Sequence, residues 1–171
     1  MNTIDKLRAQ YSPVKGSKFN VSIQFPVFLA GQLATEQINI FCQATTIPSG
    51  STDMVEVFHR GSSMKIAGDN TYPDWTVTVK MNVDYNIYKT IQRWREFMRS
   101  DILGTHANDL TYKTIATIEQ LDGADNVIFT EVLVGIFPTV VGDVTLGDEE
   151  RSNFEIFDLT FAYDYTLPQT I

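Results

Sequence analysis

Apolar and polar residues alternate along several stretches of this chain, and a period of two is typical of β-strands that bury one face. The alternation is clearest at residues 74–82 (DWTVTVKMN), where Trp75, Val77 and Val79 would all point to one side. Other stretches alternate or are rich in β-branched and aromatic residues. They predict strands at residues 19–25, 37–48, 54–59, 112–121, 127–137 and 153–166.

Two of these strands carry specific expectations about their faces. In residues 37–48, Ile38, Ile40 and Cys42 should share one side. In residues 153–166, five aromatic or aliphatic side chains should share the buried face, namely Phe157, Leu159, Phe161, Tyr163 and Tyr165.

One segment has the period of an amphipathic helix. Four apolar side chains recur at i, i+4, i+7 and i+11, and they are Ile87, Ile91, Trp94 and Met98. Asp84 precedes them as a candidate N-cap, so we expect a helix at about residues 85–99, ended by Gly104. The opposite side of this helix would be basic, with Lys89, Arg93, Arg95 and Arg99.

Seven or more strands and one helix predict a mainly-β fold of two packed antiparallel sheets, sandwich or barrel-like, with the helix flanking one side. At 171 residues the chain predicts one domain. Residues 1–18 are polar and read as an N-terminal arm, and residues 19–171 would form the domain. Within it, Gly61, Gly68 and Pro73 predict an extended loop at about residues 48–73.

Charge is unevenly distributed along the chain. The net charge of −8 argues against tight binding to nucleic acid, which Lys and Arg drive. From residue 114 onward eleven acidic residues stand against Arg151 alone, whereas residues 1–113 hold twelve basic and ten acidic ones. This split indicates a negative surface and a second surface suited to contact between copies, or simply a solvated acidic face that aids solubility.

No residue pattern typical of catalysis or metal binding occurs in the sequence. His59 and His106 have no second His or Cys at metal-ligand spacing, and Cys42, in an apolar run, is expected to be a buried, unreactive thiol. Residues 59–79 carry glycines and basic residues but lack the order of a phosphate-binding loop. We therefore expect no enzymatic activity, cofactor or metal ion. No apolar run is long enough to cross a membrane, and we expect no membrane insertion.

Several short elements follow one another along the chain. They are Ile-Pro-Ser-Gly at 47–50, His-Arg-Gly-Ser at 59–62, Lys-Ile-Ala-Gly at 65–68, Asp-Trp-Thr-Val-Thr-Val at 74–79, the helical residues 88–94, Gly-Ile-Phe-Pro at 135–138 and Phe-Ala-Tyr-Asp-Tyr at 161–165. In this order and spacing, the chain after its arm resembles the tail tube proteins of contractile-tailed bacteriophages. Ala67 stands where Pro is expected in that family, a small departure.

The resemblance implies a two-sheet β domain that assembles into six-membered rings, with four strands from each copy in a closed inner β-barrel. The rings would stack into a hollow tube inside a contractile sheath, and DNA would pass through it. The implied partners are other copies of the chain, the sheath protein, baseplate and tail-terminator proteins, and DNA in transit without tight binding. The protein would belong to the virion and be assembled in the host bacterial cytoplasm.

Candidate site residues follow from this role. Acids that repel DNA from the channel wall would be Glu119, Asp158 and Asp164. Contacts to neighbouring subunits or rings would come from Arg60, Lys65, Asp69, Tyr72, Asp148, Glu149 and Glu150, of which the last three could pair with the basic arm or helix of a neighbour. The sheath would meet Lys89, Arg93, Arg95 and Arg99, although simple solvation also accounts for this basic face.

Two alternative hypotheses remain at this point. A tube protein of a secretion or injection system that carries proteins would have the same fold. A β-sandwich carbohydrate-binding module or hydrolase would instead be a soluble monomer with a concave pocket of converging polar groups.

Overall fold

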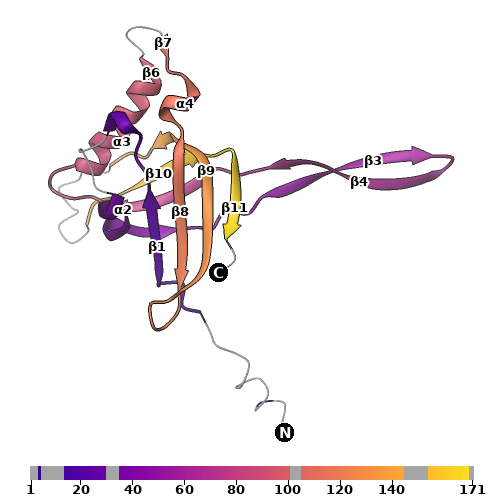
Figure 1. Cartoon of the computed structure of the whole chain (residues 1–171), viewed down its shortest axis with the longest axis horizontal. Helices are drawn as coiled ribbons and strands as arrows, with labels where there is room; N and C mark the ends of the chain where they lie inside the picture. Colours follow the sequence, from indigo (N-terminus) through magenta and orange to yellow (C-terminus); the bar gives the residue numbers. More distant parts are fainter. Residues whose placement is uncertain (1–3, 5–13, 30–34, 101–104, 145–153, 170–171) are drawn as a thin grey trace.

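Two antiparallel sheets share one long strand in this computed structural model, which describes residues 4, 14–29, 35–100, 105–144 and 154–169 (Figure 1). Sheet A has the order β1-β8-β9-β11 and is formed by Phe19–Ile23, Thr114–Leu121, the first half of Val127–Val141, and Tyr165–Gln169. Sheet B has the order β9-β10-β5-β2 and is formed by the second half of β9, Ile156–Ala162, Trp75–Lys80 and Cys42–Thr45. The predicted mainly-β fold with two antiparallel sheets is confirmed.

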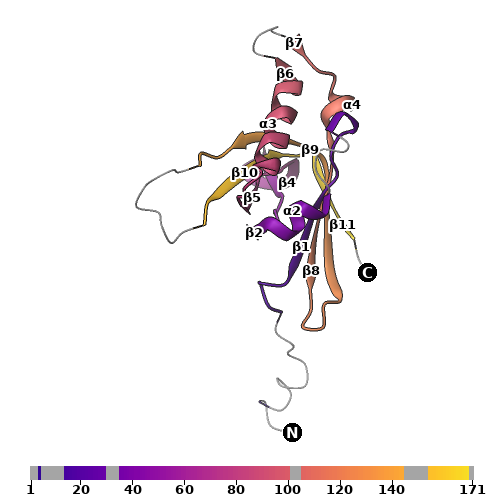
Figure 2. The same ribbon diagram turned by 90° about the vertical axis from the view of Figure 1, so that its left-hand side faces the viewer.

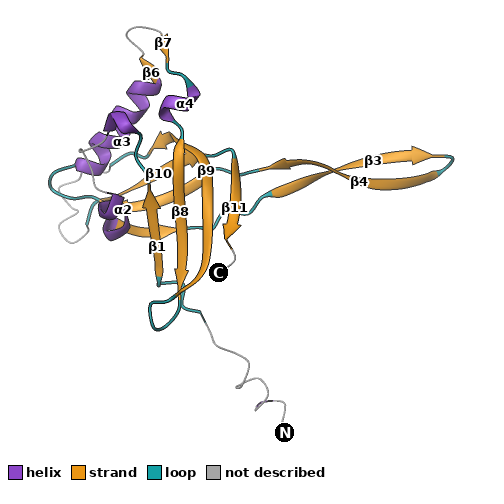
Figure 3. Ribbon diagram, in the orientation of Figure 1, coloured by secondary structure: helices purple, strands orange, loops and turns teal. Residues whose placement is uncertain are grey.

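The remaining elements lie around these sheets (Figure 3). The helical ones are the 3₁₀ helix η1 (Val27–Leu29), α2 (Thr35–Phe41), α3 (Asn86–Met98) and α4 (Asp109–Tyr112). Two further strand pairs are β3 (Ser51–His59) with β4 (Ser62–Thr71), and β6 (Arg99–Ser100) with β7 (Thr105–His106).

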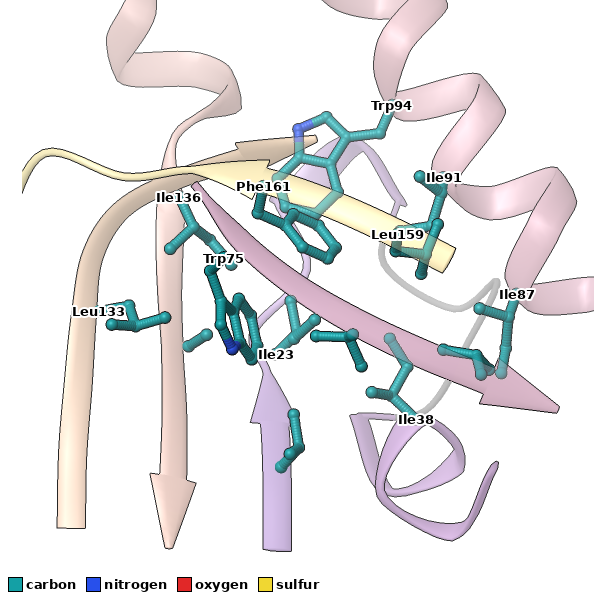
Figure 4. Close-up of a cluster of buried hydrophobic side chains, with 14 of the residues drawn as sticks. Ile23, Ile38, Trp75, Ile87, Ile91, Trp94, Leu133, Ile136, Leu159 and Phe161 are labelled. Carbon is teal, nitrogen blue, oxygen red and sulfur yellow. The ribbon is translucent and has the colours of Figure 1, made fainter. Parts of the chain in front are cut away.

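The hydrophobic core lies between the two sheets and is closed by α3 (Figure 4). Leu133 and Ile136 reach it from β9, Trp75 from β5, and Phe161 from β10, with the Trp75 and Phe161 rings 5.4 Å apart. The buried indole of Trp75 keeps its hydrogen bonds, because Nε1 donates to Thr45 Oγ1 at 2.9 Å. The predicted alternation is confirmed over Trp75–Lys80, where Trp75, Val77 and Val79 are buried, and the strand ends before Met81.

Helix α3 buries the apolar stripe that the sequence predicts. Ile87, Ile91 and Trp94 are buried, and the Trp94 indole packs against Phe161 with centroids 6.4 Å apart. The predicted N-cap is wrong, since Tyr85, at φ 53°, occupies the cap position, and its side chain makes no capping hydrogen bond to the helix. The helix ends at Met98 because Arg99 is extended, and Gly104 lies outside the described residues.

The predicted strand at residues 37–48 is wrong in its first half. Helix α2 covers Thr35–Phe41, and only Cys42–Thr45 form a strand. Ile38 is fully buried while Ile40 is 73% exposed, so these two side chains cannot share a face as the alternation suggested. Three apolar residues at alternate positions are too short a pattern to separate a strand from one turn of amphipathic helix.

The predicted strand at residues 153–166 is two strands in different sheets. Strand β10 pairs with β5 and β9 in sheet B, and β11 pairs with the other half of β9 in sheet A. The chain changes sheet at Tyr163 and Asp164, so Tyr165 leaves the buried face and is 43% exposed. Phe157, Leu159, Phe161 and Tyr163 are buried as expected.

The predicted loop at residues 48–73 is instead a long antiparallel hairpin of β3 and β4 that projects from the sandwich (Figure 1). Arg60 (φ 48°) and Gly61 (φ 84°) form its two-residue tip, and two positive φ angles suit the twist of a tight hairpin turn. Near the base, Gly68 lies against the Asp53 backbone at a register shift. The alternation of apolar and polar side chains predicted at residues 54–59 continues beyond the tip in β4, where Met64 and Ile66 are the apolar members.

Most of the predicted N-terminal arm lies outside the described residues. At its end, Lys18 Nζ bonds the β8–β9 turn, with Asp125 Oδ1 at 2.6 Å and the Gly123 carbonyl at 3.0 Å. Hydrogen bonds from Asn126 stabilise the charged form of Asp122 in this turn and lower its pKa. The arm therefore leaves the domain at this end of sheet A.

Candidate assembly surfaces

Sheet A has one buried face and one open face. Val21, Ala116, Ile118 and Leu133 mark the buried face, so the side chains between them point the other way. This open face carries Asn20, Ser22, Ile115, Thr117, Glu119, Thr130, Val132, Val134, Tyr165 and Leu167. Figure 2 shows α3 and sheet B on the opposite side of sheet A, and α4 borders the open face only at its end, where Asp109 and Leu110 line a groove with Ile115 and Val134.

The three acids predicted for a channel wall do not share one surface. Glu119 lies on the open face of sheet A, where Oε2 accepts from Asn20 Nδ2 at 3.3 Å. Asp158 lies on the outer face of sheet B, where Oδ1 accepts from Thr78 Oγ1 at 2.6 Å. Asp164 lies in the turn between β10 and β11 and pairs with Lys113 Nζ at 2.8 Å. A single wall can therefore include Glu119 or Asp158, but not both.

Asp164 stabilises the bend of β9 at Gly135. Gly135 has a φ of 75°, and a Cβ there would collide with the Asp164 carboxylate. That carboxylate reaches Lys113, next to the start of β8, so it links the bend of β9 to its neighbour strand. Asp164 thus has a local structural role that its position in the sequence did not reveal.

A groove of about 510 Å³ lies beside this bend, lined in part by Asp109, Leu110, Lys113 and Asp164. Its polar groups bond one another, because Tyr112 Oη donates to Asp109 Oδ1 at 2.7 Å and Lys113 pairs with Asp164. The bond to Asp109 raises the pKa of Tyr112. Such paired groups give little support to a carbohydrate-binding module, which needs polar groups that converge on a ligand.

One face of the β3–β4 hairpin carries four neighbouring aliphatic side chains, which we call the hairpin patch, whereas the other face mixes the exposed Met54 and Phe58 with Glu56 and Lys65. The register places Val55 opposite Ile66 and Val57 opposite Met64, so all four side chains lie on one side. Each of them is more than 40% exposed. An isolated two-stranded hairpin is marginal in water, and a contiguous apolar patch usually marks an interaction surface.

The residues predicted for contact between subunits are divided by the structure. Arg60 is at the hairpin tip, Lys65 lies opposite Glu56 on the face away from the hairpin patch, and Asp69 is exposed on β4. Tyr72 is half-buried at the hairpin base, with its ring 5.7 Å from that of Tyr163. The remaining three, Asp148, Glu149 and Glu150, lie outside the described residues.

Sequence reasoning missed the hairpin patch because it treated residues after Arg60 as a loop. The signal was present, since Val55 and Val57 before the tip are mirrored by Met64 and Ile66 after it. Alternation on both sides of a Gly-containing turn is typical of a hairpin.

The basic side of α3 is exposed, on the helix face opposite the core. Lys89, Arg93 and Arg95 lie on α3, and Arg99 follows directly after the helix as the first residue of β6. Lys89 Nζ donates to the Asp84 carbonyl at 3.0 Å, and Arg95 approaches Gln92 Oε1 at 3.5 Å. This face and the open face of sheet A look in different directions (Figure 2).

The described part of the chain has few side chains suited to nucleophilic attack or metal binding. Burial raises the pKa of the half-buried Cys42 thiol from 9.0 to about 11, which leaves it protonated near neutral pH. Tyr163 is buried with no hydrogen-bond partner for its hydroxyl, and burial raises its pKa. Among the residues placed by the structure, no three His, Cys, Asp or Glu side chains group as metal ligands. No described helix has the length and apolar character to cross a membrane.

A protein-family model described as phage tail tube protein matches residues 14–167 of this chain. The chain belongs to the phage tail tube protein family. The resemblance stated from the sequence is thereby confirmed. As a tail tube protein, the chain is a structural component of the phage virion.

Relatives and solved structures agree with this assignment. Tail tube protein gp19 of Enterobacteria phage T4 is 28% identical over 131 residues, which are 72% of this chain and 77% of that protein. The tail tube protein of Serratia phage KSP90 is 24% identical over 168 residues, or 95% of each chain. A chain in the extended sheath-tube complex of PVC, an extracellular contractile injection system, shares the fold with a TM-score of 0.68 at 15% identity, over 100% of both chains. A chain in the cap of the anti-feeding prophage also gives 0.68, at 16% identity, over 94% of this tail tube protein and 93% of that chain.

Replacing Gly135 by Ala should destabilise the tail tube protein. The bent backbone would hold the new alanine at an unfavourable positive φ, and the added Cβ would displace Asp164. The free energy of unfolding should therefore fall by about 1–3 kcal/mol. Gly123→Ala is the matched control, because nothing lies within 4 Å of its Cβ position, and it should change stability by less than about 0.5 kcal/mol. Urea denaturation measures both, and equal losses would show that the bend does not depend on Gly135.

Proposed function

We propose that six copies of this chain form a ring whose inner wall is a closed barrel of the A sheets, and that rings stack into the inner tube of a contractile tail. The observation that carries this proposal is the open face of sheet A, together with the outer edge of β11, which pairs with no described strand, and the outer edge of β1, where the Asn39 side chain of α2 bonds Val21 N–H. Joining sheets between copies satisfies these edges, which otherwise invite aggregation.

The size of such a barrel suits DNA. Four strands per copy give about 24 strands at about 4.8 Å spacing, and a tilt of about 40° gives a backbone diameter of roughly 48 Å. Side chains take about 5 Å from each side, so a duplex roughly 20 Å across passes with space to spare.

The open face also suits a channel through which DNA slides. Among the strand residues described on this face, Glu119 is the only acid and no base is present. Six copies would place a ring of Glu119 carboxylates in a wall of Thr, Ser and aliphatic side chains. The strands of such a wall lack the Lys and Arg that hold phosphates, and Lys113, which borders the wall, is paired with Asp164, so DNA would not adhere. Asp158 would lie outside this channel.

The hairpin patch would pack on another copy of the chain. Its four apolar side chains gain little from their own hairpin and would be buried on assembly. Arg60, Lys65 and Asp69 would lie at the edge of this contact, and Tyr72 would fix the base of the hairpin.

Tube formation is tested by replacing Val57 with Asp. Wild-type protein at high concentration should form tubes of uniform bore in negative-stain micrographs, whereas Val57→Asp should remain folded and form no tubes, because it buries a charge in the contact. Ser63→Asp adds the same charge to the other face of the hairpin and should still form tubes. A wild-type protein that stays monomeric at every concentration would refute the proposal.

The channel is tested by Glu119→Lys. A ring of lysines should attract phosphates and slow DNA delivery by assembled phage at least several-fold, most strongly at low salt. Asp158→Lys makes the same charge change on sheet B and should deliver DNA at the wild-type rate. Normal delivery by virions that contain Glu119→Lys would show that sheet A does not line the DNA path.

The basic side of α3 would face the sheath protein, because it looks away from the open face of sheet A (Figure 2). Changing Lys89, Arg93, Arg95 and Arg99 to Gln should leave tubes intact but weaken sheath polymerisation around them in a co-sedimentation assay. Sheath assembly at the wild-type level would mean that these residues only solvate the helix.

A further inference from the structure

The proposed ring predicts which edges of sheet A meet. Strand order runs from β1 through β8 and β9 to β11, and every neighbouring pair is antiparallel. β1 and β11 therefore run in opposite directions (Figure 1). Copies related by rotation about a tube axis would bring β11 of one beside β1 of the next, and the joint would also be antiparallel.

The backbone groups at the outer edge of β1 can be identified. Gln24 N–H donates to the Ile115 carbonyl, and Leu121 N–H to the Lys18 carbonyl, both at 3.0 Å. Since antiparallel residues alternate in direction, the odd-numbered residues of β1 direct N–H and C=O away from β8. These are Phe19, Val21 and Ile23.

The same alternation, followed through β8 and β9, identifies the outer edge of β11. Leu167, opposite Val132, directs its backbone toward β9, whereas Thr166 and Pro168 direct theirs outward. Proline is tolerated at such an edge because it has no N–H to leave unpaired. The β11 edge thus offers two carbonyls but one N–H, and it needs donors from the strand that joins it.

The central donor of the β1 edge is already occupied. Val21 N–H donates to Asn39 Oδ1 at 3.1 Å, from the side chain of α2. Asn39 Nδ2 in turn donates to Asn20 Oδ1 at 3.3 Å, and Asn20 Nδ2 donates to Glu119 Oε2 at 3.3 Å. The Asn39 side chain therefore occupies the position that a carbonyl of a joining strand would take.

This contact is suited to release. The hydrogen bonds donated by the side-chain amides of Asn39 and Asn20 are both 3.3 Å long, which exceeds the usual donor–acceptor distance of about 2.7–3.2 Å. Asn39 itself is only half-buried. Its neighbour Ile38 is fully buried and anchors α2 on the core. Because α2 packs beside β1, a strand that joins this edge requires Asn39 to rotate away from Val21 and α2 to leave room for it.

Resting on the proposed function, we propose that Asn39 guards the β1 edge of the free subunit. The guard satisfies Val21 N–H and blocks strand addition between subunits away from a growing tube. On joining a ring, Asn39 gives up Val21 N–H to a backbone carbonyl of β11 from the neighbouring copy. Because one hydrogen bond replaces another, Asn39 weakens the association of subunits slightly without preventing it.

The test is the critical concentration for tube formation, measured by light scattering and pelleting of purified full-length protein. Asn39→Ala removes the competing acceptor and should lower this concentration about two- to tenfold, the effect of one net hydrogen bond. Asn39→Asp holds Val21 N–H with a charged acceptor and should raise it by a similar factor. Asn86→Ala, at an exposed asparagine of α3, should leave it unchanged.

Hydrogen exchange in the free subunit gives a second readout. The Val21 amide should exchange faster in Asn39→Ala than in wild type, below the concentration at which tubes form. Tubes with the same critical concentration in all four proteins would overturn the guard and leave the proposed function intact. Should Asn39→Ala not fold, an unchanged or lower critical concentration for Asn39→Asp would overturn it. Absence of tubes from wild type would instead refute the proposed function.

Discussion

The bend of β9 at Gly135 is the constraint on which the rest of the structure depends. One strand serves both sheets, and its two halves pair with β8 and β11 on one side of the bend and with β10 on the other. The positive φ of Gly135 and the Asp164 carboxylate packed above it fix this change of direction. Because the two sheets share a strand, they enclose one core.

That arrangement determines what sheet A leaves exposed. Sheet B and α3 cover one of its faces, so hydrophobic burial stabilises the subunit from that side alone. The opposite face and the two outer edges remain for contact with other molecules. A subunit with one core and an open sheet face suits assembly into a tube. It also needs protection of its edges, which explains a side chain such as Asn39 at the middle of β1.

Much of this fold could be predicted from local pattern. Strand β5 and helix α3 have strong periods of 2 and 3.6, and both occur almost where they were expected. The pattern failed where it was short, as in α2, and where the chain turned within an unbroken apolar alternation, as at Tyr163 and Asp164. That turn depends on Lys113 and Gly135, which are distant in sequence from Asp164, and no local rule includes them. The same limit explains why Glu119, Asp158 and Asp164 seemed equivalent in the sequence, although Glu119 lies on the open face of sheet A, Asp164 borders that face beside Ile115 and Val134, and Asp158 lies on sheet B.

A cryo-EM reconstruction of the wild-type tube would show which sheet lines the bore and which strands meet between neighbouring copies. We expect one continuous antiparallel barrel of A sheets, with β11 of each copy paired to β1 of the next, Glu119 facing the channel, and Asn39 rotated away from Val21. A bore lined by sheet B or by α3, or subunits that touch only through their hairpins, would contradict this expectation.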